Sequence, residues 1–267
     1  MVRSEFPAAR LIELDHAALP GEARNAGLRA ARGRYVTFPG SHVTVSAGAL
    51  HACVRAHRMG YAMVSGTMLN GTTTWSGWAS YLLDNSTVLP GRTSQPLTNP
   101  PIRCSYLRDA LLEVDGFPED MRAGEDTAVN GELFARGYSA YREQNMVFRH
   151  YSPCRHPARL VTHHFVRGRA LGRLMFDGAR AAGRFPDRRS ARFAVLGLPA
   201  RVRTIWRNTR LWGPELRWRL WIASPLVLAG AFSAWAGACY ELIRRARPAI
   251  GRMTRDTSRP DRRPAPP

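Results

Sequence analysis

Two adjacent carboxylates, Glu125 and Asp126, follow Gly124 near the middle of the chain. A carboxylate at the edge of a pocket can accept a proton from a hydroxyl group, which is general-base chemistry. The same pair also suits the start of a helix, with Asp126 as the N-cap and Glu125 as an acid that complements the helix dipole. Taken alone the pair is explained by the helix start, so its role depends on the sequence around it.

Two histidines stand at the ends of predicted strands. Ser41 and His42 come shortly after the apolar run at 35–38, and His150 follows the strand predicted at 138–148. Imidazole can donate a hydrogen bond to phosphate or bind a divalent cation such as manganese. The alternative is a tight turn with a surface histidine at His42 and a structural residue at His150.

The order of the predicted elements sets the fold class. Short β-branched and aromatic runs alternate with segments of helical apolar spacing, and such alternation predicts an α/β fold with a mostly parallel sheet and crossover helices. Residues 84–103 contain repeated prolines and are predicted as loop. Strands are predicted at 9–14, 35–38, 61–65 and 138–148, and helices at 21–31, 47–59, 106–116 and 126–137.

Two segments then resemble a known family. ARNAGLRAARGRYVTF, at 23–38, resembles the ARNxGxxxAxGxYxxFLD segment of family-two glycosyltransferases, which have the GT-A fold. SYLRDALLEVDGFPEDMRAGEDTAVNGELFARGY, at 105–138, resembles the acceptor-side segment of the same family, in which a Glu-Asp pair opens a helix. The resemblance spans about residues 8–150, and the order and separation of the two segments make it more specific than either alone.

The resemblance implies an activity and a set of site residues. Such enzymes transfer a sugar from a nucleotide-sugar donor to an acceptor hydroxyl with inversion at the anomeric carbon. By this resemblance Asp126 is the catalytic base, with Glu125 beside it. Arg24 and Asn25 help to shape the donor site, and His150 meets the metal or the diphosphate. The alternative for Asn25 is a packed helix residue.

The metal motif departs from the family pattern. Where an Asp-x-Asp sequence usually follows the strand, the chain has Gly40, Ser41 and His42. Two carboxylates there normally hold a divalent cation, Mn²⁺ or Mg²⁺, that offsets the charge of the donor diphosphate. The sequence therefore leaves His42 as the candidate metal ligand, and Ser41 and His42 as candidate donor-binding residues.

The start of the family's nucleotide-binding half has no counterpart before the ARN segment. We therefore expect either a longer natural protein or a degenerate relative with an incomplete sheet. The second reading is a non-catalytic, GT-like, membrane-associated binding protein whose donor site is lost. The aromatic loop with Trp75, Trp78 and Tyr81 can stack on a sugar or a nucleobase, and the alternative there is core packing.

The charge is concentrated in the second half of the chain. All 39 fixed side-chain cations are arginines, 15 of them up to residue 150 against 14 acids, and 24 beyond it against 6 acids. Arginines alternate with apolar residues at 188–219, and Leu220–Tyr240 is free of charge and long enough to cross a bilayer. This pattern predicts contact with a membrane surface, as a span or an in-plane helix; the alternative is a buried helix.

The remaining predictions concern partners, location and domain limits. Nucleic-acid binding is disfavoured, since no recognised motif accompanies the basic charge and that charge flanks an apolar span. Four dispersed cysteines and the absence of a secretory signal favour a reduced setting, at the cytoplasmic face of the cell membrane, with a lipid-linked or glycan acceptor. We expect a GT-A-like domain at 1–155, a basic and apolar helical region at 156–247, and a disordered tail at 248–267.

Overall fold

The computed structural model describes residues 2–181 and 188–256. Its strands form one six-stranded sheet with the neighbour order β1-β5-β3-β6-β2, and β4 also pairs with β6. Those strands are β1 (Tyr35–Thr37), β2 (Val43–Val45), β3 (Met63–Asn70), β4 (Gln95–Leu97), β5 (Cys104–Leu107) and β6 (Ala140–His150).

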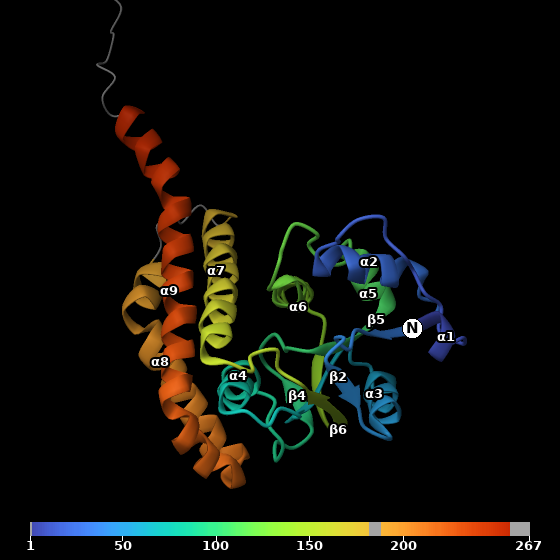
Figure 1. Cartoon of the computed structure of the whole chain (residues 1–267). Helices are drawn as coiled ribbons and strands as arrows, with labels where there is room; N and C mark the ends of the chain where they lie inside the picture. Colours follow the sequence, from blue (N-terminus) through green and yellow to red (C-terminus); the bar gives the residue numbers. More distant parts are fainter. Residues whose placement is uncertain (1, 182–187, 257–267) are drawn as a thin grey trace, which may run out of the picture.

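Helices lie around this sheet and in a layer at one side of it. Figure 1 shows α7, α8 and α9 side by side on one flank, and α2, α5 and α6 on the other side of the sheet. In chain order the helices are α1 (Val2–Glu5), α2 (Pro20–Ala30), α3 (Ala49–Arg58), α4 (Trp75–Asn85), α5 (Arg108–Glu113), α6 (Glu125–Ala135), α7 (Pro157–Ala181), α8 (Arg188–Trp212), the 3-10 turn η1 (Pro214–Leu216) and α9 (Arg217–Asp256).

The strand directions confirm the α/β class, but they correct the prediction that the sheet is mostly parallel. β3 and β6 pair in parallel, and β1 runs in the same direction as both. β5 lies antiparallel between β1 and β3, while β2 and β4 pair antiparallel with β6. Parallel pairing is thus confined to β3 and β6 among the described strands. Hydrophobic periodicity identifies strands, but it does not report which strands become neighbours.

One predicted strand is absent. Residues 9–14 have no regular secondary structure, and Leu11, Ile12 and Leu14 are 42%, 44% and 39% exposed. A strand needs a neighbour to satisfy its backbone N–H and C=O groups, and none of the described strands pairs with these residues. The apolar run therefore passes over the surface as an extended segment.

Most other elements lie within a few residues of their predicted limits. The predicted helices at 21–31 and 47–59 are α2 and α3, and the strand at 138–148 is β6. The stretch from Tyr106, predicted as helix, opens as β5 and becomes helical only at Arg108. Tyr106 in the strand and Ala110 and Leu111 in the helix are all buried, so apolar spacing did not separate strand from helix in this stretch.

Glycines set both ends of α6. Gly124, with φ +86°, is the N-cap, so the predicted N-cap role of Asp126 is wrong and Asp126 stands at the second helical position. Gly137, also with φ +86°, follows the C-cap and confirms the predicted helix stop. Glycine takes positive φ without a steric cost, which lets the chain enter the helix sharply with both carboxylates at its start.

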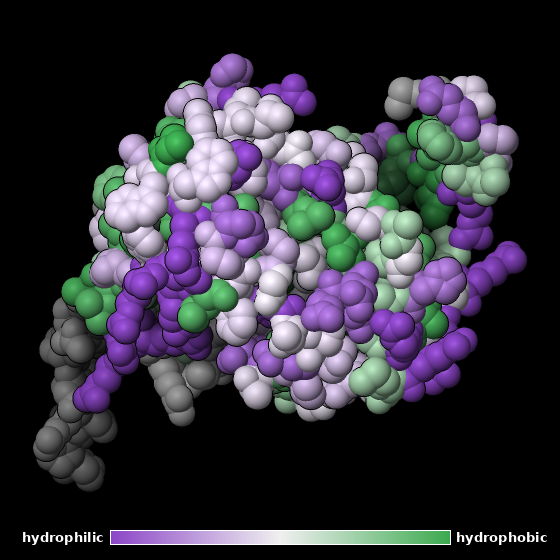
Figure 2. Space-filling model, turned by 90° about the horizontal axis from the view of Figure 1, so that it is seen from below, coloured by the Kyte–Doolittle hydropathy of each residue, from purple (hydrophilic) through white to green (hydrophobic). Residues whose placement is uncertain are grey.

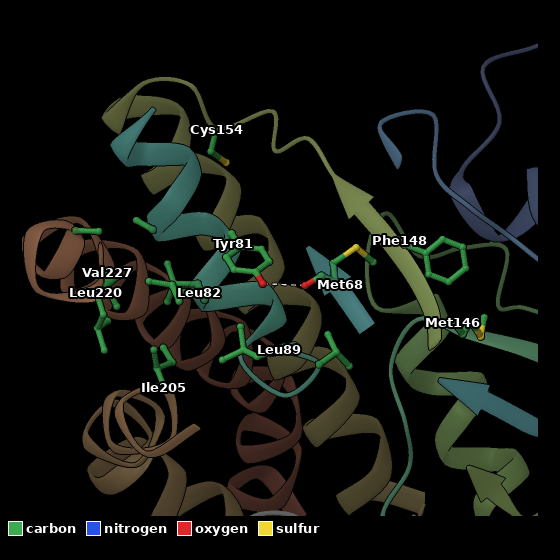
Figure 3. Packing of buried hydrophobic residues seen from close by; sticks show 14 of the residues in the cluster. Met68, Tyr81, Leu82, Leu89, Met146, Phe148, Cys154, Ile205, Leu220 and Val227 are labelled. Carbon is green, nitrogen blue, oxygen red and sulfur yellow. Dashed lines mark hydrogen bonds between the residues drawn. The ribbon is translucent and has the colours of Figure 1, made fainter. Parts of the chain in front are cut away.

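The main core joins the sheet to the helical layer. Tyr81 and Leu82 of α4 are 1% or less exposed, and the Tyr81 hydroxyl donates to the carbonyl of Met68 over 2.8 Å. Figure 3 shows Leu220 and Val227 of α9 packed against the same cluster. The loop at 151–156 therefore does not separate two independent cores, because the helices beyond the predicted boundary at 155 share the core of the sheet.

Small residues bring α7 and α9 close together. A Cβ atom added at Gly168 would overlap the carbonyl of Ala234, and one added at Gly237 would overlap the carbonyl of Phe165. Buried in this interface, Glu241 of α9 accepts hydrogen bonds from Arg169 over 3.0 Å, and from two arginines of its own helix. The two helices form one rigid pair with a fully partnered charge between them.

The apolar C-terminal region is one long helix. Within the described residues, Pro214–Ala246 is long and apolar enough to cross a membrane, and 39% of its most apolar window is buried inside the protein. α9 continues to Asp256, so residues 248–256 of the predicted tail are helical, and 257–267 lie outside the described residues. Seen from below, hydrophobic side chains form separate spots among hydrophilic ones, without one broad apolar patch (Figure 2).

Candidate functional site

Polar side chains converge at one edge of the sheet. Because β1, β3 and β6 run the same way and β5 and β2 run the opposite way, the ends of the first three meet the starts of the other two. Ligands of open α/β sheets bind outside the carboxyl ends of such strands. His42 directly precedes β2 and His150 ends β6, so both lie at this edge. In Figure 1, α6 lies above the strands and α7 lies beside them.

The two carboxylates at the start of α6 differ in their surroundings. Glu125 is 5% exposed, and its Oε1 lies 2.7 Å from Nη1 of Arg24 on α2. Burial raises the pKa of Glu125, and the Arg24 guanidinium opposes that rise. Asp126 is half-buried, and its Oδ1 accepts a hydrogen bond from the backbone N–H of Thr127 over 2.8 Å. Asp126 therefore retains an open carboxylate oxygen, while Glu125 is engaged by Arg24.

Asn25 is engaged by the protein itself. Its side chain is 4% exposed; Nδ2 donates to the carbonyl of Phe117 over 2.8 Å, and Oδ1 accepts from the N–H of Phe117 over 2.8 Å. A second hydrogen of the amide is directed to Glu119. These contacts match the packed-residue alternative, in which Asn25 fastens α2 to the turn before α6 and so positions the carboxylates.

The two predicted histidines lie against each other. The rings of His42 and His150 are 4.8 Å apart at an interplanar angle of 72°, because Val43 of β2 pairs with His150 of β6. His150 is 4% exposed, and its Nδ1 has no hydrogen-bond partner. Burial, helped by the charges of Arg103 and His42, lowers the pKa of His150 to about 4. Ser41 lies exposed in the turn before β2.

Arg103 is a site residue that the sequence did not reveal. It directly precedes β5 with φ +54°, a left-handed conformation that is uncommon for a residue with a side chain. Its guanidinium interacts electrostatically with Asp84 and Asp126, and also with His42 and His150. Burial lowers the pKa of Arg103, and Asp84 partly offsets this. A single arginine after two prolines gives no signal in a sequence.

A second missed group ties α7 to α4 beside the site. Asp84, whose side chain is 7% exposed, lies 3.1 Å from Nε of Arg167, 3.8 Å from Nε2 of His163 and 4.0 Å from Nδ1 of His164. Burial alone would raise the pKa of Asp84, but Arg167 and His163 hold it well below its ordinary value. The helical spacing of His163, His164 and Arg167 was the available signal.

The residues at this edge do not form a metal site. Among the described residues, no group of three or more His, Cys, Asp or Glu side chains surrounds one point. His42, the predicted metal ligand, has His150 and the Arg103 guanidinium as neighbours, and a fixed positive charge disfavours a cation there. The nearby Asp84 and Glu125 are engaged by arginines. These side chains therefore offer Mn²⁺ or Mg²⁺ few free oxygen ligands, and the role of His42 as a metal ligand stays a prediction.

An open cavity of about 440 Å³ lies beyond the histidines along the same edge. Asn70, which lines it, pairs with His150 across β3 and β6. Its charged lining residues are Arg149 and Arg219, and the Arg219 guanidinium lies 4.2 Å from the ring centre of Trp78. Trp78 is therefore at a cavity wall, whereas Tyr81 is core, and both belong to helix α4, which corrects the prediction of a loop there. The complete lining is Asn70, Gly71, Thr72, Thr73, Trp78, Arg149, Tyr151 and Arg219.

Comparisons with known proteins give one family. Residues 2–113 match the sequence model of the family described as Glycosyl transferase family 2. No curated protein matches the chain. Among solved structures, the chain is similar to S. aureus TarS 1-349 in complex with UDP-GlcNAc, with 13% identity, a TM-score of 0.43, and coverage of 84% of this chain and 74% of that one. A structure of S. aureus TarS 1-349 alone gives 14% identity, a TM-score of 0.37, and coverage of 81% and 70%.

Proposed function

We propose, from the match of residues 2–113 to glycosyl transferase family 2, the reaction of this glycosyltransferase and the residues that carry it. The protein transfers a sugar from a nucleotide-sugar donor to an acceptor hydroxyl with inversion at the anomeric carbon, and Asp126 is the general base. The observation that carries this assignment is the open carboxylate of Asp126 at the sheet edge, beside a Glu125 that is already engaged by Arg24.

The proposed step places each group in a role. The acceptor oxygen attacks the anomeric carbon as its proton passes to Asp126. The bond from that carbon to the diphosphate oxygen breaks on the opposite face, and its electron pair leaves with the nucleoside diphosphate. Attack and departure on opposite faces give inversion. The Arg24–Glu125 ion pair and Asn25 hold the start of α6 in place for this step.

We place the acceptor in the cavity lined by Arg149 and Arg219. The cavity adjoins His150, and its wall includes the Trp78 ring, which can stack against a sugar. Arg219 belongs to α9, the apolar helix, whose exposed side chains include Trp221 at 64% and Phe232 at 54%. These features support a lipid-linked or glycan acceptor near a membrane surface. We propose that the reaction belongs to cell-envelope synthesis at the cytoplasmic face of the cell membrane.

Asp126→Asn tests the assignment of the base. The amide cannot accept the proton, so we expect the transfer rate of the detergent-solubilised chain to fall about 10²- to 10⁴-fold, with nucleotide binding retained. Glu132→Gln, on the exposed part of the same helix, is the matched control and should keep the parent rate. Equal transfer by Asp126→Asn and the parent, measured with a panel of nucleotide sugars, would show the assignment to be wrong.

A second candidate function follows from the residues after β1. No carboxylate pair occupies the position of the Asp-x-Asp sequence, which favours a non-catalytic protein that binds a glycan or partner at the membrane. Donor binding separates the two candidates. Thermal stabilisation of the chain by uridine, guanosine or thymidine diphosphate supports the transferase, and no stabilisation by any of them supports the binding protein.

A further inference from the structure

We propose that the guanidinium of Arg103, together with His42 and His150, holds the donor diphosphate directly and that this binding needs no divalent cation. The inference rests on the proposed function, because it assigns the group that meets the donor of that reaction. It concerns His42, which lies at the Asp-x-Asp position, and Arg103 and His150, which lie outside it. It is carried by their geometry and by the positions of the charges around them.

Arg103 lies within electrostatic range of three residues of the site. These are His42, His150 and Asp126, the proposed base. An anion bound by Arg103 would therefore lie in the same site as the histidines and as the carboxylate that receives the proton.

The guanidinium of Arg103 is free to bind a ligand. Two neighbouring arginines are engaged, since Arg24 is paired with Glu125 and Arg167 with Asp84, at 2.7 and 3.1 Å. In the described part of the chain, Arg103 has no ion pair within 4.0 Å and no hydrogen bond from its side chain, and Asp84 and Asp126 act on it only at longer range. A guanidinium presents five N–H donors in a fixed fork that matches phosphate oxygens, so Arg103 has its whole binding capacity available.

The backbone fixes the direction of this side chain. The φ of Arg103 is +54°, and a non-glycine residue keeps such a conformation only where its surroundings impose it. The two residues before it are held by their carbonyls. Asn130 donates to the carbonyl of Pro101 over 3.0 Å, and Ser65 donates to the carbonyl of Ile102 over 2.7 Å. Strained backbone of this kind is concentrated at binding and catalytic sites.

His150 supplies an independent observation at the same place. Its Nδ1 is buried without a hydrogen-bond partner, on a side chain that is 4% exposed. A buried polar atom without a partner is costly in a folded protein, and a ligand oxygen would satisfy it. The ring centre of His42 lies 4.8 Å from that of His150, so one ligand group can contact both imidazoles, and both lie within electrostatic range of Arg103.

The same charges suit an anion better than a cation. A metal ion at this edge would meet the unpaired charge of Arg103, whereas a diphosphate would be attracted by it. When the donor bond breaks, the electron pair moves to the diphosphate oxygen, and the increased negative charge is stabilised by Arg103. Electrostatic stabilisation of a leaving group by fixed donors is the role that the metal has in other such sites.

Binding measurements without transfer test the inference. The detergent-solubilised chain is titrated calorimetrically with uridine, guanosine and thymidine diphosphates, once with EDTA and once with manganese. We expect the preferred nucleotide to bind with the same Kd, within about twofold, under both conditions, and inorganic pyrophosphate to displace it in EDTA. Binding that requires manganese would overturn this inference alone. No binding under either condition would contradict the proposed function and this inference with it.

Arg103→Gly tests the residue itself. Glycine accepts the positive φ, so the variant can keep the backbone conformation while it loses the whole side chain with its guanidinium. We expect the Kd for the nucleoside diphosphate to rise about 10- to 100-fold, and the weaker binding of the nucleoside to stay unchanged. Asp115→Gly is the matched control, since Asp115 is the other non-glycine residue with positive φ, at +57°, among the described residues. Diphosphate binding by Arg103→Gly at the parent Kd would overturn the inference.

Discussion

Among the described residues, arginines at the α7–α9 interface are paired with a carboxylate, whereas Arg103 at the sheet edge is not. Glu241, in the helix interface, accepts hydrogen bonds from Arg169, Arg244 and Arg245. At the sheet edge Arg103 has no ion pair within the described residues, and the buried Nδ1 of His150 has no partner. Charges that only support the fold are satisfied by the fold itself. The unpaired guanidinium of Arg103, on a strained backbone, and the unbonded Nδ1 of His150 indicate a place where a ligand supplies the missing partners.

The comparison predicts that the largest losses of stability come from the helical layer. Leu82→Ala removes a side chain that is fully buried between α4 and α9, and we expect the free energy of unfolding to fall by about 2–5 kcal/mol. Leu112→Ala, at a position that is 40% exposed on α5, is the control and should cost much less. Urea denaturation followed by circular dichroism measures both. A similar cost at the two positions would mean that the layer is not part of the core.

Acid should destabilise the sheet edge through its buried histidines. Burial lowers the pKa values of His150 and His164 to about 4, below the ordinary 6.5 that each regains on unfolding. The unfolded chain therefore binds more protons than the folded chain between these values. Stability is present above pH 6.5 and is lost as the pH falls toward 4.

Variants at these two histidines test that pH dependence. Melting temperatures of His150→Gln and His164→Gln, measured from pH 7 to pH 4.5, should fall less steeply than those of the parent chain. His51→Gln, at an exposed position on α3, is the control and should keep the slope of the parent. If both buried variants kept the parent slope as well, acid destabilisation would have another source.

A smaller effect is expected from the satisfied charge of the helix interface. Glu241→Gln keeps the shape of the side chain but leaves three guanidinium groups without their shared carboxylate. Since these arginines are 26–49% exposed, water screens them, and we expect a loss of about 1–3 kcal/mol. Nucleotide binding should not change. Weaker nucleotide binding in this variant would show that the two regions are coupled.

The smallest expected change in stability is at Arg103, and it distinguishes the two regions because it is a gain and not a loss. Arg103→Gly relieves a left-handed backbone, and we expect the chain to become more stable by about 1 kcal/mol while its diphosphate binding weakens. Stability gained where binding is lost is the usual relation at a functional site. A loss of stability in this variant would mean that Arg103 supports the fold.

The sequence predicted the elements better than their arrangement. Gly137 ended α6 as expected, because positive φ is a local property that glycine allows. β2 and β4 were missed because three-residue strands carry too little periodicity to be recognised. The direction of β5 depended on contacts with β1 and β3, which lie far from it in the chain.

The candidate site was predictable only where a motif carried it. Asp126, Glu125 and Arg24 were found by resemblance, and the structure places them together at the sheet edge. Arg103 and Asp84 were not found, because their proximity arises from folding and no spacing in the sequence reports it. Asn25 belonged to the right segment, but its amide proved to hold a turn, which depends on Phe117, 92 residues later.

Because Arg219 of α9 lines the cavity, the cavity is complete only once α9 has docked. Asn70 and Arg219 both line one cavity, yet they are 149 positions apart in the 267-residue chain (219 − 70). Closing so long a loop carries an entropic cost that only the docking of α9 offsets. A chain whose strands have paired but whose last helix has not docked has the carboxylate edge without this cavity. The cavity thus exists only in the completely assembled protein.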